Sequence, residues 1–180
     1  MVEQINEYLK YISFEQLQKV VEQAIDETNQ SISTITDRDV LESLGMGRLL
    51  ETKLARSMNT IPDFTFVHGK ENRKDKDIMC VSGLVAEYPA NFFSVEVKTS
   101  KTKSVIGNKS YANDTPTEGS KDRNSFYIII CNYKEVGIIK SYDAFFGYIE
   151  QKDWKPADSG SSAHLDFKKL FYDGKLIKLI

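Results

Sequence analysis

The stretch from Phe92 to Ser100 constrains the fold most, because from Phe93 onward apolar or β-branched residues alternate with polar ones. Successive side chains of a β-strand point to opposite faces of the sheet. One face, suited to a core, carries Phe93, Val95, Val97 and Thr99. The opposite face carries Ser94, Glu96, Lys98 and Ser100. Glu96 and Lys98 therefore form either a solvated salt-bridge row or half of a metal-dependent hydrolytic site.

Composition limits the class of protein. The chain has 180 residues, 41% of them apolar and 11% aromatic, enough for one globular domain spanning residues 1–180. Its formal charge of −2 shows no basic surplus of the kind common in nucleic-acid binders. Two cysteines in apolar runs and two histidines argue against a disulfide or a zinc site. The acidic N-terminus and the lack of a membrane-length apolar run predict a cytoplasmic protein without a membrane contact.

The first sixty residues have helical periodicity. Ser13 and Gln16 form a capping-box pattern ahead of apolar residues at helical spacing, which predicts a helix to about Thr28. A second helix is expected over 48–58, with a short one before it that carries Val40, Leu41 and Leu44. Glu51 lies at the edge of the buried side of helix 48–58, a position that by itself indicates an exposed helix charge near Lys53 and Ala55.

From Ile61 the pattern becomes that of strands. Strands are expected at 64–67, 77–81 and 92–100, the last two as an antiparallel hairpin. The apolar run 126–132 suits the centre of a sheet, and 136–149 supplies further strand material. Residues 151–163 are expected to be a polar connection, and Asp173 and Gly174 a turn. The fold class is therefore mixed α/β (α+β), with N-terminal helices packed on a central mixed sheet.

The segment 101–124 is polar, and its first half is basic with no acid before Asp114. It is either a solvated surface loop or a segment that follows the phosphates of a nucleic acid. The candidate DNA-binding residues, chosen by side-chain chemistry, are Lys101, Lys103, Asn108, Lys109, Ser110, Tyr111, Arg123 and Asn124.

A hairpin of strands 77–81 and 92–100 would bring Asp77 toward Glu96. Two converging carboxylates repel each other unless they share a cation, and hard oxygen ligands favour Mg²⁺, with Mn²⁺ as a substitute. Such an ion would polarise a phosphodiester and activate a water, while Lys98 would orient that water and neutralise the transition state. The pair Pro62-Asp63 makes Asp63 a rival for the first acid, although it stands 33 residues before Glu96.

Asp77, eighteen intervening residues and then Glu96-Val97-Lys98 resemble the pattern of the PD-(D/E)XK nuclease superfamily. The sequence around these residues, together with Gly107-Asn108-Lys109-Ser110-Tyr111 after them, is similar to the sequences of type II restriction endonucleases and in particular of a ScaI-like group. The resemblance covers roughly residues 51–132. It departs from the superfamily in lacking a clear amphipathic helix between Lys98 and Phe126.

The resemblance implies a restriction-endonuclease-like core in which Asp77, Glu96 and Lys98 are catalytic and Glu51 is the acid on the preceding helix. It implies Mg²⁺-dependent hydrolysis of double-stranded DNA at a short specific site. Cutting both strands of a palindrome would then call for a homodimer.

Two other functions are compatible with the same residues. A repair or recombination nuclease would use this site on a DNA structure rather than on a sequence. A non-catalytic α/β module that binds nucleic acid or protein would leave Glu96 and Lys98 as a solvated row. Metal dependence distinguishes a nuclease from the non-catalytic module. A defined digestion pattern distinguishes a restriction endonuclease from a repair or recombination nuclease.

Overall fold

The structure is a computed structural model that describes residues 2–35, 45–69, 75–83, 85–102, 104–108, 111–112, 123–131, 133, 138–158 and 162–180. The predicted short helix with Val40, Leu41 and Leu44 lies outside these ranges. Within them, no helix has both the length and the apolar character needed to cross a membrane.

Among the described residues, three helices precede the sheet: α1 (Glu3–Leu9), α2 (Phe14–Ser33) and α4 (Met46–Met58). The predicted capping box is confirmed, because the Ser13 side chain accepts from the Gln16 backbone while the Gln16 side chain accepts from the Ser13 backbone. α2 runs five residues beyond its predicted end. α1 was not predicted, since Ile5 and Tyr8 are the only residues on its buried side.

The main sheet has six strands in the order β1-β2-β3-β5-β6-β9, and only β3 and β5 are parallel neighbours. The strands are β1 (Phe64–His68), β2 (Ile78–Gly83), β3 (Val95–Ser100), β5 (Ser125–Cys131), β6 (Asp143–Ile149) and β9 (Leu176–Lys178). The predicted mixed sheet and the antiparallel pairing of β2 with β3 are confirmed. The chain is thus an α+β protein consistent with a restriction-endonuclease-like core.

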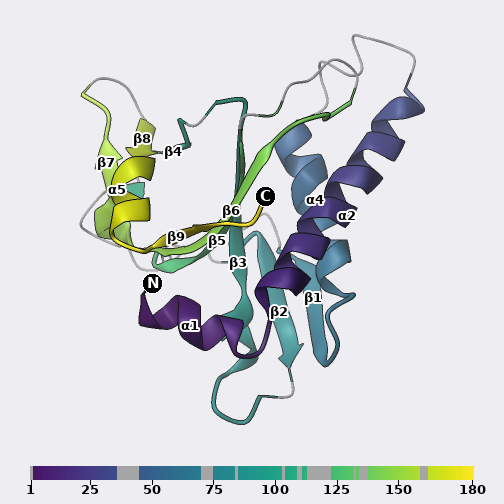
Figure 1. The fold of residues 1–180 in the computed structure, drawn as a ribbon, viewed down its shortest axis with the longest axis horizontal. Helices are drawn as coiled ribbons and strands as arrows, with labels where there is room; N and C mark the ends of the chain where they lie inside the picture. Colours follow the sequence, from purple (N-terminus) through teal and green to yellow (C-terminus); the bar gives the residue numbers. More distant parts are fainter. Residues whose placement is uncertain are drawn as a thin grey trace.

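β5 is buried along its whole length, as its continuous apolar run predicted. Phe126, Ile128 and Ile130 belong to the core under the helices, whereas Tyr127 and Ile129 belong to a second core on the other face. Figure 1 shows α2 and α4 on one side of the molecule, and a small sheet with α5 on the other. Both faces of β5 are covered, so the strand has no solvated side.

The second layer contains β4 (Ile106–Asn108), β7 (Trp154–Pro156) and β8 (Ser162–Leu165), in the order β4-β8-β7, and the short helix α5 (Phe167–Tyr172). The prediction that 151–163 is a polar connection was therefore wrong. Trp154, Ala163 and Leu165 are buried in the second core. Strands of three or four residues carry too few alternations to be recognised in a sequence.

The strand predicted from Phe92 begins at Val95 instead. Ala90–Phe93 forms a 3₁₀ helix, η1, and Phe93 packs against Tyr8 and Phe64 with ring centroids 5.4 and 4.8 Å apart. Phe92 and Phe93 therefore belong to the 3₁₀ helix before the strand, and the prediction that the strand begins at Phe92 was wrong. Val95 and Val97 do face the helix-side core, as the alternation predicted.

A charged cluster fixes the turn that leads into β7. Lys175, just after the predicted turn at Gly174 (φ 68°), donates to Glu150 Oε2 at 2.7 Å and to Asp153 Oδ2 at 2.7 Å. The bond from Lys175 to Glu150, followed by the one from Lys152, lowers the pKa of Glu150. Residues 150–153 include the 3₁₀ helix η3 (Gln151–Asp153), directly before Trp154. The cluster therefore holds the segment that delivers Trp154 to the second core.

Replacing Lys175 with Met should lower the free energy of unfolding by about 1–3 kcal/mol at about pH 7, because two carboxylates lose their shared donor. A carboxyl group with a lowered pKa stabilises the fold above its ordinary pKa of 4.5 and ceases to do so as the pH falls through the lowered value. The difference between wild type and K175M should therefore shrink as the pH falls below 4.5. Urea denaturation at several pH values measures it. K178M, which removes an exposed pair with Asp143, should cost less than about 1 kcal/mol, and equal losses would contradict the prediction.

Candidate active site

The candidate site lies where β2 and β3 separate. The two strands pair at a single position, Ile78 with Val95. On either side of it, side chains replace main-chain acceptors: Ser94 Oγ accepts from the Cys80 amide at 2.9 Å, and Asp77 Oδ2 accepts from the Val97 amide at 2.9 Å. The opening between the strands is therefore lined by polar side chains.

Asp77 lines this opening and is held there by a hydrogen bond from the backbone of β3. It stands directly before β2, and its bond to the Val97 amide continues the ladder toward the middle of β3. The same oxygen lies 3.8 Å from Lys98 Nζ. The predicted hairpin thus brings Asp77 beside the Glu96-Val97-Lys98 segment.

Glu96 lies on the face of β3 opposite the helices, beside Tyr127 of β5, and is only 1% exposed. Its Oε1 is 4.0 Å from Lys76 Nζ, and its Oε2 is 4.0 Å from Lys98 Nζ. Burial raises the pKa of Tyr127 well above its usual value, and the charge of Glu96 adds to that rise. Glu96 is therefore a buried acid between two ammonium groups and not part of a solvated row.

Lys98 is surrounded by oxygen atoms. Its Nζ donates to the Val97 carbonyl at 3.1 Å and lies within 4.0 Å of oxygens of both Asp77 and Glu96. Burial lowers the pKa of this lysine, but Tyr111, Asp77 and Glu96 outweigh burial and raise the pKa above its ordinary value. Lys98 therefore remains an ammonium group at neutral pH, placed against the two carboxylates.

A family model described as ScaI restriction endonuclease matches residues 4–180. The chain belongs to the ScaI restriction endonuclease family. No curated protein matches the sequence. Membership in the ScaI restriction endonuclease family supports a type II restriction endonuclease, an endodeoxyribonuclease that binds DNA. It also accounts for the predicted resemblance and extends it from residues 51–132 to nearly the whole chain.

Enzymes of the restriction endonuclease class generally use a divalent metal ion. Among the described residues, no three His, Cys, Asp or Glu side chains come close enough to hold one. Mg²⁺ needs only one or two carboxylates, because it retains several waters. Asp77 Oδ2, Glu96 Oε2 and the Val97 carbonyl, which surround Lys98 Nζ, are hard oxygen donors of that kind. The donor set fits a magnesium ion in its chemistry.

The other two acids lie apart from this donor set. Glu51, on α4, has its Oε2 3.7 Å from His68 Nε2, and His68 pairs with Ile78 next to Asp77. Glu51 is therefore at the same end of the β1–β2 hairpin, in contact with a histidine. Asp63 precedes β1, where Phe64 pairs with Gly83 at the far end of β2. The register thus places Asp77, and not Asp63, beside Glu96.

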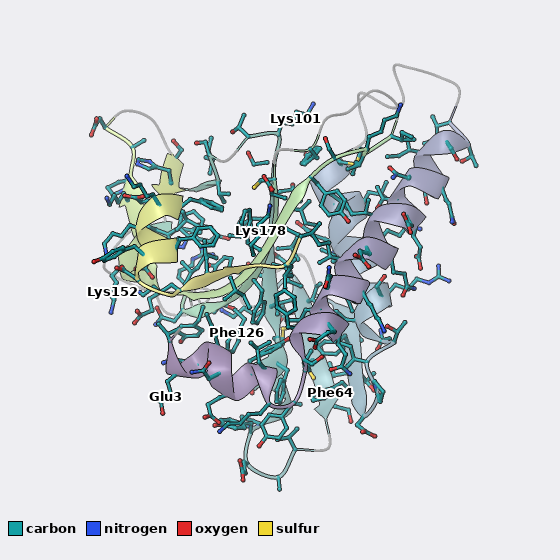
Figure 2. The ribbon with its side chains drawn as sticks, in the orientation of Figure 1. Glu3, Phe64, Lys101, Phe126, Lys152 and Lys178 are labelled. Atoms are coloured by element: carbon teal, nitrogen blue, oxygen red, sulfur yellow. The ribbon has the colours of Figure 1, made fainter. Side chains whose placement is uncertain are left out.

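The DNA-binding candidates fall into three groups. Lys103, Lys109, Ser110 and the side chain of Asn108 lie outside the described residues. Lys101 is exposed beyond β3, at the end of the sheet away from Phe126 (Figure 2), and Asn124 is exposed with its Oδ1 accepting from the Gln151 amide. Tyr111 is only 7% exposed, and Arg123 Cζ lies 4.0 Å from the centroid of its ring. These two residues lie against each other, and Tyr111 lies beside Lys98.

Sequence reasoning missed Lys76. Its ammonium group is 4.0 Å from Glu96 Oε1, and it donates to the Asn124 carbonyl at 3.4 Å. The position next to Asp77 was a signal, but Lys76 comes before the predicted strand 77–81, so no alternation indicated the side to which it points. Asp77 and Lys76 precede β2, where that alternation does not apply.

Replacing Asp77 with Ala should lower the free energy of unfolding by about 1 kcal/mol, because the Val97 amide loses its acceptor. Asn at this position keeps an acceptor oxygen, so D77N should lose less than D77A. Urea denaturation in the presence of EDTA measures both. Equal losses would show that the hydrogen bond to Val97 does not hold the two strands together.

Proposed function

We propose that the chain is a Mg²⁺-dependent type II restriction endonuclease that hydrolyses phosphodiester bonds of double-stranded DNA at a short specific sequence. The observation that carries this proposal is the convergence of buried Glu96, Asp77 and the Lys98 ammonium group within 4.0 Å contacts. Family membership favours a sequence-specific enzyme over a repair nuclease or a non-catalytic module.

In this proposal Asp77 and Glu96 hold Mg²⁺, with Mn²⁺ as a substitute. When bound, the ion supplies positive charge that stabilises the transition state at the scissile phosphate. Lys98 orients the attacking water and neutralises negative charge on the phosphate, for which its raised pKa keeps it protonated. Glu51 acts from α4 through His68, at 3.7 Å, and orients the end of the β1–β2 hairpin next to Asp77.

DNA contacts are assigned to the predicted basic segment, with exposed Lys101 and Asn124 on phosphates. A homodimer with twofold symmetry is proposed because a palindromic site presents the same bases to two identical subunits. One nuclease domain over residues 1–180 and a cytoplasmic location stay predictions from the sequence.

Purified protein incubated with plasmid and phage DNA and Mg²⁺ should give discrete fragments. Addition of EDTA or the K98A substitution should abolish them, because the first removes the ion and the second the ammonium group. K152A is a matched control, since Lys152 is an exposed lysine that pairs with Glu150. It should cut like the wild type. A metal-dependent smear would favour a nuclease without sequence specificity, and intact DNA under every condition would refute catalysis.

Metal binding can be tested without DNA. Titration calorimetry with Mn²⁺ should show binding to the wild type, weakened at least about tenfold in D77N and in E96Q. The reason is that each substitution replaces a charged oxygen donor with a neutral amide. E87Q, which changes an exposed acid bonded to Tyr11, should bind like the wild type. Binding that is unaffected in both site variants would place the metal elsewhere.

A further inference from the structure

We infer that Tyr111 is a positioning residue for DNA cleavage, whose ring holds the Lys98 ammonium group beside Asp77 and Glu96. The centroid of the Tyr111 ring lies 5.1 Å from Lys98 Nζ. This inference rests on the proposed catalytic role of Lys98. It gives Tyr111 a function other than the contact with DNA phosphates that side-chain chemistry alone suggested.

A lysine needs such a restraint because its side chain has four rotatable bonds and a compact charge at the end. Two oxygen atoms restrict the position of Lys98 Nζ: the Val97 carbonyl oxygen at 3.1 Å and Asp77 Oδ2 at 3.8 Å. An aromatic face attracts a cation within about 6 Å of its centroid. The ring thereby holds the ammonium group and adds no negative charge to a site that already has two carboxylates.

Tyr111 is itself held in place by three neighbours. Arg123 Cζ lies 4.0 Å from its ring centroid, and the Trp154 ring lies 4.6 Å away at an angle of 54°. The third neighbour, Gly107, packs closely against both rings, since a Cβ at that residue would lie 2.9 Å from Trp154 Cζ3 and 3.2 Å from Tyr111 Cδ2. Any side chain at 107 would displace one of the two rings. The packed rings of Tyr111 and Trp154 in the second core therefore lie next to Lys98 and limit the movement of Tyr111.

Burial separates this role from a direct DNA contact. Only 7% of Tyr111 is exposed, so little of the ring is available to a sugar or phosphate. The ring contacts Lys98, Arg123 and Trp154. A residue of this kind should change the rate of cleavage more than the affinity for DNA.

The first test compares Y111L, which removes the ring, with Y111F, which keeps it. The substrate is a duplex that carries the site mapped from the wild-type digest. Y111L should lower kcat on the order of tenfold, with KM and DNA affinity in Ca²⁺ changed less than about threefold, and Y111F should stay within about threefold of wild type. Y133L is the matched control, because Tyr133 is a tyrosine of similar burial (6%) in the helix-side core. It should lose stability and keep kcat.

The second test does not depend on cleavage. In protein labelled with ¹³C at lysine Cε, the Lys98 resonance is assigned from its absence in K98R. The Tyr111 ring should shift this resonance, so Y111L should move it toward the position of exposed lysines while Y111F and Y133L leave it in place. If the wild type cuts no DNA, the proposed function fails and this measurement still decides whether Tyr111 holds Lys98.

Three results would overturn the inference. One is a Lys98 resonance that does not move in Y111L. Another is an equal loss of kcat in Y111F and Y111L, which would assign the effect to the hydroxyl group. The third is a loss of DNA affinity in Y111L that matches its loss of rate, which would make Tyr111 a DNA contact.

Discussion

The site depends on the burial of one charge. Glu96 is 1% exposed in the middle of a sheet, and a carboxylate removed from water costs several kcal/mol unless other charges replace its hydration. Lys76 and Lys98, each 4.0 Å from one of its oxygens, supply that replacement. Ion pairs rarely recover the whole cost, and an apolar residue at 96 would suit the second core better. A fold that retains the acid here, with two lysines arranged around it, gives up stability for function.

The parts that the sequence predicted are those with a local or periodic signal. Ser13 and Gln16 defined the start of α2, the apolar run of β5 placed it at the sheet centre, and the alternation in β3 assigned Val97 to one core and Glu96 to the other face. The hairpin of β2 and β3 followed from two strands joined by a short connection. Once that pairing is given, register alone places Asp77 opposite Glu96.

What the sequence could not supply depends on contacts between distant segments. Trp154 packs against Tyr111 and Tyr127. It lies on β7, and a strand of three residues has no measurable period. Lys76 precedes its strand, so no alternation fixed the side to which it points. The described part of the β3-to-β5 crossover contributes β4 to the second sheet, which no periodicity in the polar segment 101–124 predicted.

The arrangement also explains why net charge was a poor guide. The whole chain carries a formal charge of −2, yet Lys76 and Lys98 lie within 4.0 Å of carboxylate oxygens of Glu96 and Asp77, so two cations balance two carboxylates among the described residues of the site. A divalent ion on those carboxylates would make the local charge positive. Because screening confines the effect of a surface charge to about 10 Å in salt solution, a phosphate responds to this local balance and not to acids on distant helices such as α2. A nuclease of this kind needs a small positive site, and the remaining surface is free to be acidic.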